Sequence, residues 1–115
     1  MNERNLFCLE HMLECIIAIE AYTEAVDVKT DERTLDAILR HLQILAESSK
    51  RVSEELKAVY EDVPWRELAG FRNVVVHDYL AISTERIVPI VRRDIPALKE
   101  RLLAILATMG KAPGH

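Results

Sequence analysis

Three side chains that can bind or move charge lie close together past the middle of the chain. Arg72 carries a permanent positive charge on a planar fork of N–H donors, and His77 titrates near neutral pH, so it can take up or release a proton. Tyr79 adds a phenolic hydroxyl two positions later. A fixed cation near a proton acceptor suits a reaction in which negative charge builds up on the substrate.

The segment that must position these side chains, Trp65 to Leu80, has the periodicity of a helix. We predict a helix over 64–79, with Pro64 in its first turn, where a proline sacrifices no intrahelical hydrogen bond. On a helical wheel, Arg72 falls in the middle of the apolar face, whereas Asn73 and His77 lie one turn apart on another side. The apolar face comprises Trp65, Leu68, Ala69, Phe71, Val75, Val76 and Tyr79.

An arginine on an apolar face needs a partner, because it does not deprotonate and burying its charge alone is costly. Two interpretations are open: an ion pair between Arg72 and a glutamate of the preceding helix, or a cleft at a symmetric dimer interface that receives Arg72 and His77 from each subunit. An ideal helix places these two positions about 140° apart. Either the helix bends or frays near His77, or the two residues act from different subunits. The three valines at 74–76 favour a strand, but no second candidate strand exists to pair with it, so helix is preferred.

The composition indicates an all-α protein with one domain over 1–115, built as an antiparallel bundle of four to five helices. Only three glycines and four prolines occur, and half of the residues are hydrophobic. Besides the helix at 64–79, apolar residues recur at helical spacing from about Asn2 to Val28 and over 32–60, which we predict as one long helix. A last helical region at 84–108 contains Pro89 and Pro96, so we expect a late start or a kink there, then a break near Ile95 with Pro96 opening a fresh first turn.

The overall charge gives no general attraction to nucleic acid, since the chain carries a net charge of −4. Any contact with RNA would need a local basic cleft, for which Arg92 or Arg93 are candidates within an otherwise solvated face that includes Lys99 and Arg101. The amino-terminal sequence fits neither a signal peptide nor a membrane span, so we expect a cytoplasmic protein.

The first helix contains two cysteines, Cys8 and Cys15, roughly 10 Å apart along the helix, which is too far for a disulfide. We expect reduced thiols in the core. Together with His11 they form a conceivable metal-ligand set, but a fourth ligand is missing, and no metal is predicted.

Four other residues have structural interpretations. We expect Glu47 as a buried partner of an arginine, Trp65 in core or dimer packing, and His41 and His115 at the surface.

The residues Arg72 to Tyr79, RNVVVHDY, resemble the signature of the HepT-like family within the HEPN superfamily: arginine, a polar residue, three more, histidine, any residue and tyrosine. The preceding VPWRELAGFRN is similar to the family's lead-in to this motif. Residues 37–56 are similar to its second helix, with Ala46 where the family often has glycine, and DIPALKERL resembles its last helix.

This resemblance implies a helical bundle that forms a homodimer in which two motifs face one cleft. It implies metal-independent cleavage of RNA, not DNA, without a cofactor, by the toxin of a toxin–antitoxin pair. His77 would act as the base and Arg72 as the cation at the phosphate. Asn73 would fix the tautomer of His77 or bind phosphate, and Asp78 would orient an imidazole.

The resemblance also implies a partner. A minimal, MntA-like nucleotidyltransferase would be the antitoxin and would silence the toxin by transferring AMP to Tyr79. The alternative function is a non-catalytic helical adaptor that binds such a nucleotidyltransferase, which the acidic net charge favours.

Overall fold

The computed structural model describes residues 3–25, 32–78 and 84–109, and the side chains of 25, 32, 72–78 and 84–86 are not described within these ranges. Every regular element in the described part of the chain is helical, and no strand occurs there, so the all-α prediction is confirmed. The molecule measures 41 × 28 × 20 Å. No helix among the described residues is long and apolar enough to cross a membrane.

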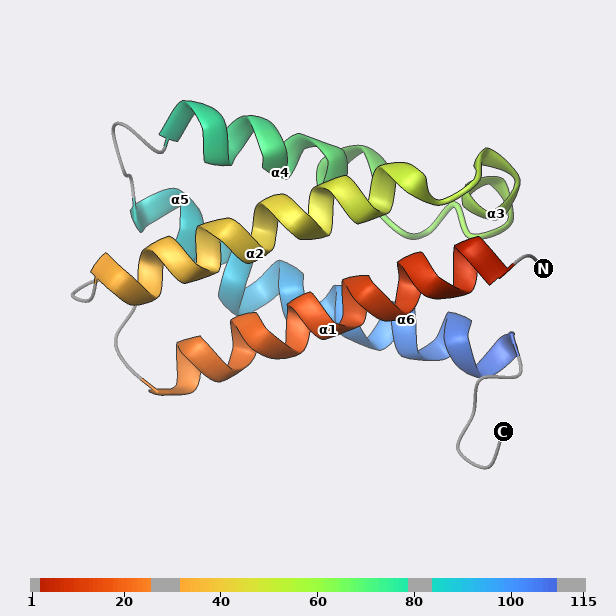
Figure 1. The fold of residues 1–115 in the computed structure, drawn as a ribbon, viewed down its shortest axis with the longest axis horizontal. Helices are drawn as coiled ribbons and strands as arrows, with labels where there is room; N and C mark the ends of the chain where they lie inside the picture. The colour runs from red at the N-terminus through yellow and green to blue at the C-terminus, as the bar shows by residue number, and fades with distance from the viewer. Residues whose placement is uncertain (1–2, 26–31, 79–83, 110–115) are drawn as a thin grey trace.

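The first two helices, α1 (Glu3–Ala25) and α2 (Glu32–Arg51), run antiparallel side by side (Figure 1). Both form because apolar residues recur every three or four positions, which puts them on one face of each helix. Leu9, Met12, Ile16 and Ile19 of α1 are completely buried. The α1 range lies inside the predicted 2–28. Thr30 and Asp31, whose residue types could cap the second helix, lie outside the described residues.

The prediction of one continuous helix over 32–60 is wrong, because the helix is interrupted at Val52 and Ser53. The last turn of α2 tightens, with the Val52 amide bonded to the Ser49 carbonyl at 3.3 Å. Ser53 is extended (φ −65°, ψ 151°) and begins a short helix, α3 (Glu54–Val59), by accepting a hydrogen bond from the Leu56 amide at 3.2 Å. Serine is a preferred N-cap, since its hydroxyl satisfies an amide that the helix cannot.

A contact with α1 holds this break in place. The Asn5 side chain donates from Nδ2 to the Ser53 hydroxyl at 2.9 Å and accepts from the Ser53 amide at 2.9 Å. Asn5 is buried, so these bonds are shielded from water. The start of α1 is therefore tied to the junction between α2 and α3.

Helix α4 (Trp65–Asp78) packs against α2 after a turn that follows α3. Pro64 precedes the helix, not in its first turn as predicted, and its carbonyl accepts the amide of Leu68 at 3.0 Å. Trp65 is partly buried against the core, and its indole donates to the Tyr60 carbonyl at 3.0 Å, which confirms the core-packing prediction.

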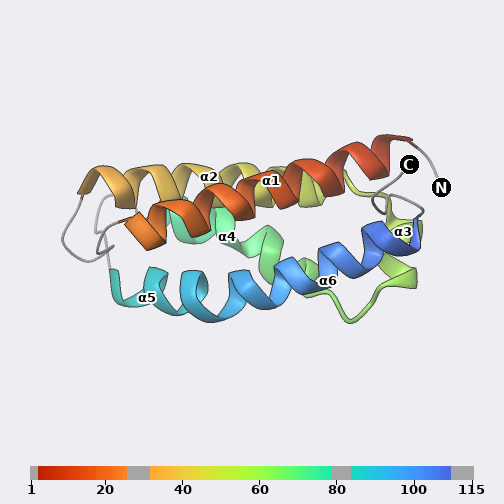
Figure 2. The ribbon, with the colours of Figure 1, turned by 90° about the horizontal axis from the view of Figure 1, so that it is seen from below.

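The last helical region contains a π-helical segment between its two prolines, and the predicted break near Ile95 is wrong, because Ile95 stays helical (φ −65°, ψ −47°). Helix α5 (Thr84–Pro89) leads into η1 (Ile90–Asp94) and then α6 (Ile95–Thr108) without leaving helical conformation. The Ile95 amide bonds to the Ile90 carbonyl, five residues back. Pro96 has no backbone N–H to donate, and in a regular α-helix its ring would clash with the carbonyl four residues earlier. The wider turn is a known way to accommodate such an interruption. Figure 2 shows this region on one side of the molecule and the α1–α2 pair on the other.

Candidate functional site

The predicted motif lies on α4. The backbone positions of Arg72, Asn73, His77 and Asp78 belong to this helix, and the three valines between them are helical rather than extended. Tyr79 lies outside the described residues.

The helix is continuous through His77 and ends at Asp78. Five steps along a regular α-helix rotate a position by about 140°, so positions 72 and 77 lie on different faces of α4. No interruption of the helix separates the two positions in the backbone.

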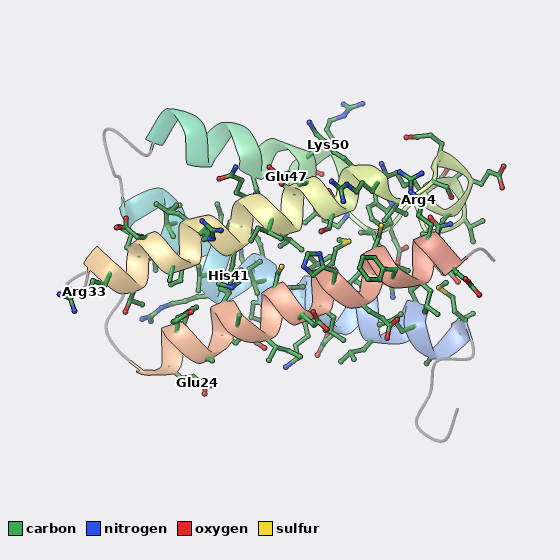
Figure 3. The ribbon with its side chains drawn as sticks, in the orientation of Figure 1. Arg4, Glu24, Arg33, His41, Glu47 and Lys50 are labelled. Carbon is green, nitrogen blue, oxygen red and sulfur yellow. The ribbon has the colours of Figure 1, made fainter. Side chains whose placement is uncertain are left out.

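The prediction that Glu47 is buried is wrong. Its neighbours Leu45 and Ala46 are completely buried, and Glu47 itself is exposed and accepts a hydrogen bond from Gln43 at 3.3 Å. The reason is the helical position of Glu47, which lies between the buried positions 45–46 and 48–49 and therefore points to the outer side of α2 (Figure 3).

A cavity of about 410 Å³ lies between the first half of α4 and the segment formed by η1 and α6. Its apolar lining consists of Pro64, Leu68, Phe71, Ala97 and Leu98. Its charged lining consists of Asp62, Glu67, Arg93, Asp94 and Arg101. Phe71 directly precedes Arg72, so the cavity opens beside the motif along the same helix.

Two ion pairs border this cavity. Arg101 pairs with Asp62, and Arg93 contacts Asp94 from Nε at 3.2 Å. The Arg101 Nε atom is buried and has no hydrogen-bond partner within the described part of the chain. Arg92 and Arg93 are exposed, as predicted. The expected solvated face does not extend to Lys99, which is half-buried and pairs with Glu20 at 2.8 Å, because α6 packs on α1 there.

The cysteines are free and buried in α1, which confirms the prediction of core thiols. Burial raises the pKa of the Cys15 thiol, and the negative charge of Glu14 adds to the effect. His11 shares a hydrogen bond with the Ser48 hydroxyl at 3.0 Å. No group of three His, Cys, Asp or Glu side chains in the described ranges is arranged to hold a metal ion.

The expectation that His41 is a surface residue is wrong. Its ring is half-buried at the α1–α2 seam, where it bonds the Ala37 carbonyl at 2.8 Å and lies 5.6 Å from the ring of Tyr22 (Figure 3). His115 lies outside the described residues.

The sequence alone did not predict the cavity between α4 and the η1–α6 segment. Its walls come from residues 62–71 and 93–101, and only the packing of distant helices brings them together. The one available signal was the pair Pro89 and Pro96, which predicted irregular helix around Arg93 and Asp94.

Comparisons with known proteins identify the family of this chain. The family model described as "Ribonuclease HepT-like" matches residues 12–105. A "Probable ribonuclease HepT" of Thermococcus cleftensis is 34% identical over 94 residues, which cover 79% of this chain and 86% of that protein. No solved structure shows a significant match.

A longer relative shares the same region. The Methanocaldococcus jannaschii protein named "Gamma-glutamylcyclotransferase and putative RNase" is 33% identical over 106 residues, which are 90% of this chain and 48% of that protein. The chain thus spans about half the length of this relative. Since the family model covers most of the sequence, the chain belongs to the HepT-like ribonuclease family of the HEPN superfamily.

Proposed function

We propose that this protein is an endoribonuclease that cuts RNA without a metal ion and acts as the toxin of a toxin–antitoxin pair. The observation that carries the proposal is the family match over residues 12–105, because this range includes the whole motif from Arg72 to Tyr79. Relatives that match most of the chain are named as ribonucleases.

The motif contains the groups that such a reaction needs. His77 takes the proton of a ribose 2′-hydroxyl, the 2′-oxygen attacks the adjacent phosphorus, and the bond to the 5′-oxygen breaks while that oxygen takes a proton from water. Arg72 offsets the negative charge that builds up on the phosphate oxygens. Asn73 fixes the tautomer of His77 or binds the phosphate, and Asp78 orients the imidazole.

The active unit in this proposal is a homodimer. Positions 72 and 77 lie on different faces of one continuous helix, about 140° apart. A two-fold axis near α4 would bring Arg72 of one subunit towards His77 of the other, and both motifs would face one cleft.

Replacement of the histidine tests the catalytic assignment. His77→Ala should lower RNA cleavage by at least about 10²-fold, because it removes the only base in the motif that titrates near neutral pH. Cleavage of a labelled RNA by the purified dimer, with and without EDTA, measures this. Arg66→Ala is the matched control, since Arg66 is exposed on α4 outside the motif. Full activity of His77→Ala would refute the assignment, and loss of wild-type activity in EDTA would refute metal independence.

We further propose that a minimal nucleotidyltransferase silences the protein by transferring AMP to Tyr79. A bulky nucleotide there would block the cleft and place negative charge beside Arg72. Co-expression with a nucleotidyltransferase encoded by an adjacent gene should raise the intact mass of this protein by one or more AMP units. The substitution Tyr79→Phe should remove the increase. An unchanged mass increase in Tyr79→Phe would assign the modification to another residue.

The second candidate function is a non-catalytic adaptor for the nucleotidyltransferase. The net charge of −4 and the acidic outer side of α1, which exposes Glu3, Glu14 and Glu24, favour it, because both weaken attraction to RNA. An absence of cleavage at any protein concentration, with stable binding of the nucleotidyltransferase, would support the adaptor.

A further inference from the structure

We infer that the cavity between α4 and the η1–α6 segment binds an unpaired nucleobase that carries an exocyclic amino group. The choice of an RNA base as the ligand rests on the proposed ribonuclease function. The site itself stands on the geometry of described residues.

The cavity has the size and the floor of a small-molecule site. Its volume of about 410 Å³ falls within the usual range for such sites. Leu68, Phe71 and Leu98 form an apolar floor and are themselves buried, so their positions are set by the core. A flat aromatic base would lie over this floor against the exposed side chains of Pro64 and Ala97 and remove their apolar surface from water.

The two walls offer opposite hydrogen-bonding groups. On the α4 wall, the exposed carboxylate of Glu67 has no ion-pair partner in the described ranges, so both its oxygens can accept hydrogen bonds. A carboxylate accepts from the amino group of a base such as cytosine. Uracil has no amino group and would leave Glu67 without this bond.

The opposite wall supplies a cation. Arg93 contacts Asp94 only through Nε, and its two terminal nitrogens have no partner among the described residues. These donors suit phosphate oxygens of the RNA backbone. Arg93 and Asp94 belong to the π-helical segment, and such segments occur frequently at functional sites.

The position of the cavity fits a neighbour of the cleavage site. Phe71 on its floor stands one position before Arg72 on α4, about 100° around the helix, so we assign the base held there to a nucleotide near the reacting phosphate. The cavity would then select RNA by the base beside the cut.

A substitution that fills the cavity tests the inference. Ala97 is exposed and lines the cavity, and Ala107 is an exposed alanine on the same helix outside it. The probes are AMP, CMP and UMP, with binding measured by isothermal titration. AMP or CMP should bind wild type more tightly than UMP. Ala97→Trp should weaken that binding roughly tenfold, and Ala107→Trp should leave it unchanged.

A second variant tests the role of the carboxylate without changing the shape of the site. Glu67→Gln should reduce the preference for AMP and CMP over UMP, with the fold monitored by circular dichroism. Equal binding of all three nucleotides by wild type, or unchanged binding by Ala97→Trp, would overturn the inference. Loss of the dimer in Ala97→Trp alone, measured by sedimentation, would also overturn it, because the cavity would then be an interface between copies.

The outcomes separate this inference from the proposed function. If wild type cuts RNA and Ala97→Trp cuts the same sequences at the same rate, the base site is wrong and the ribonuclease stands. If wild type cuts no RNA but binds AMP, and Ala97→Trp loses this binding, the base site stands and the proposed function fails.

Discussion

At the scale of single residues, Cys15 illustrates how the core changes the chemistry of a side chain. Burial among apolar residues of α1 raises its pKa, and the neighbouring carboxylate of Glu14 raises it further. The thiolate, which is the reactive form, is therefore suppressed. We expect Cys15 to be a packing residue in the folded protein rather than a nucleophile.

This shift predicts a loss of stability at alkaline pH. The pKa of Cys15 is higher in the folded chain than in the unfolded chain. The stability that the protonated thiol contributes is therefore fully present below the ordinary thiol pKa of 9.0, and it is lost as the pH rises through the pKa of the folded state. Urea denaturation at pH 7.5 and pH 10 should show a decrease in the free energy of unfolding that is smaller in Cys15→Ala. An identical decrease in both proteins would contradict the assignment.

At the scale of elements, the break between α2 and α3 depends on a contact far away in sequence. The Asn5 side chain forms hydrogen bonds with both the hydroxyl and the amide of Ser53, and the same hydroxyl caps α3. Apolar periodicity runs through the break, since Val52 and Leu56 are both buried. Periodicity alone therefore predicts a continuous helix, and the polar contact with α1 decides otherwise.

A double-mutant cycle measures this contact. Asn5→Ala should destabilise the protein by about 1–3 kcal/mol, because it leaves the half-buried hydroxyl and amide of Ser53 without the Asn5 side chain as partner. Ser53→Ala should cost about as much, since it also removes the cap of α3. The two losses should not add, because the side chains share one interaction. Additive losses in urea denaturation would show that the two residues act independently, and Arg4→Ala, at an exposed neighbouring position, is the control.

At the scale of the whole molecule, the uninterrupted helix α4 bears on how the proposed catalytic residues cooperate. Positions 72 and 77 cannot share a face of one regular helix. The cavity beside Phe71 lies on the same helix, so a dimer that joins two α4 helices would also bring two such cavities near one cleft.

Mixing two inactive variants tests the arrangement across subunits. Arg72→Ala and His77→Ala should each be inactive, but refolding them together should restore about a quarter of the wild-type sites, because half of the dimers are mixed and each has one intact pair. RNA cleavage by the mixture measures this. Recovery that does not exceed either variant alone would place both residues of a working pair on the same subunit.

The sequence by itself determined the helical class, the positions of most helices, the buried thiols and the presence of irregular helix between Pro89 and Pro96. These features follow from local physics, since apolar spacing defines a buried face and proline removes a backbone donor. The candidate motif was recognised from sequence because its residues follow one another closely in the chain, and those from Arg72 to Asp78 share α4.

Only the tertiary structure decided where the second helix breaks, that Glu47 faces outwards, that His41 is half-buried, and that residues 62–71 and 93–101 enclose a cavity. Each of these depends on side chains that are distant in sequence and meet only when the helices pack. A helical period specifies which residues share a face, but the phase and angle of the neighbouring helix determine what that face meets.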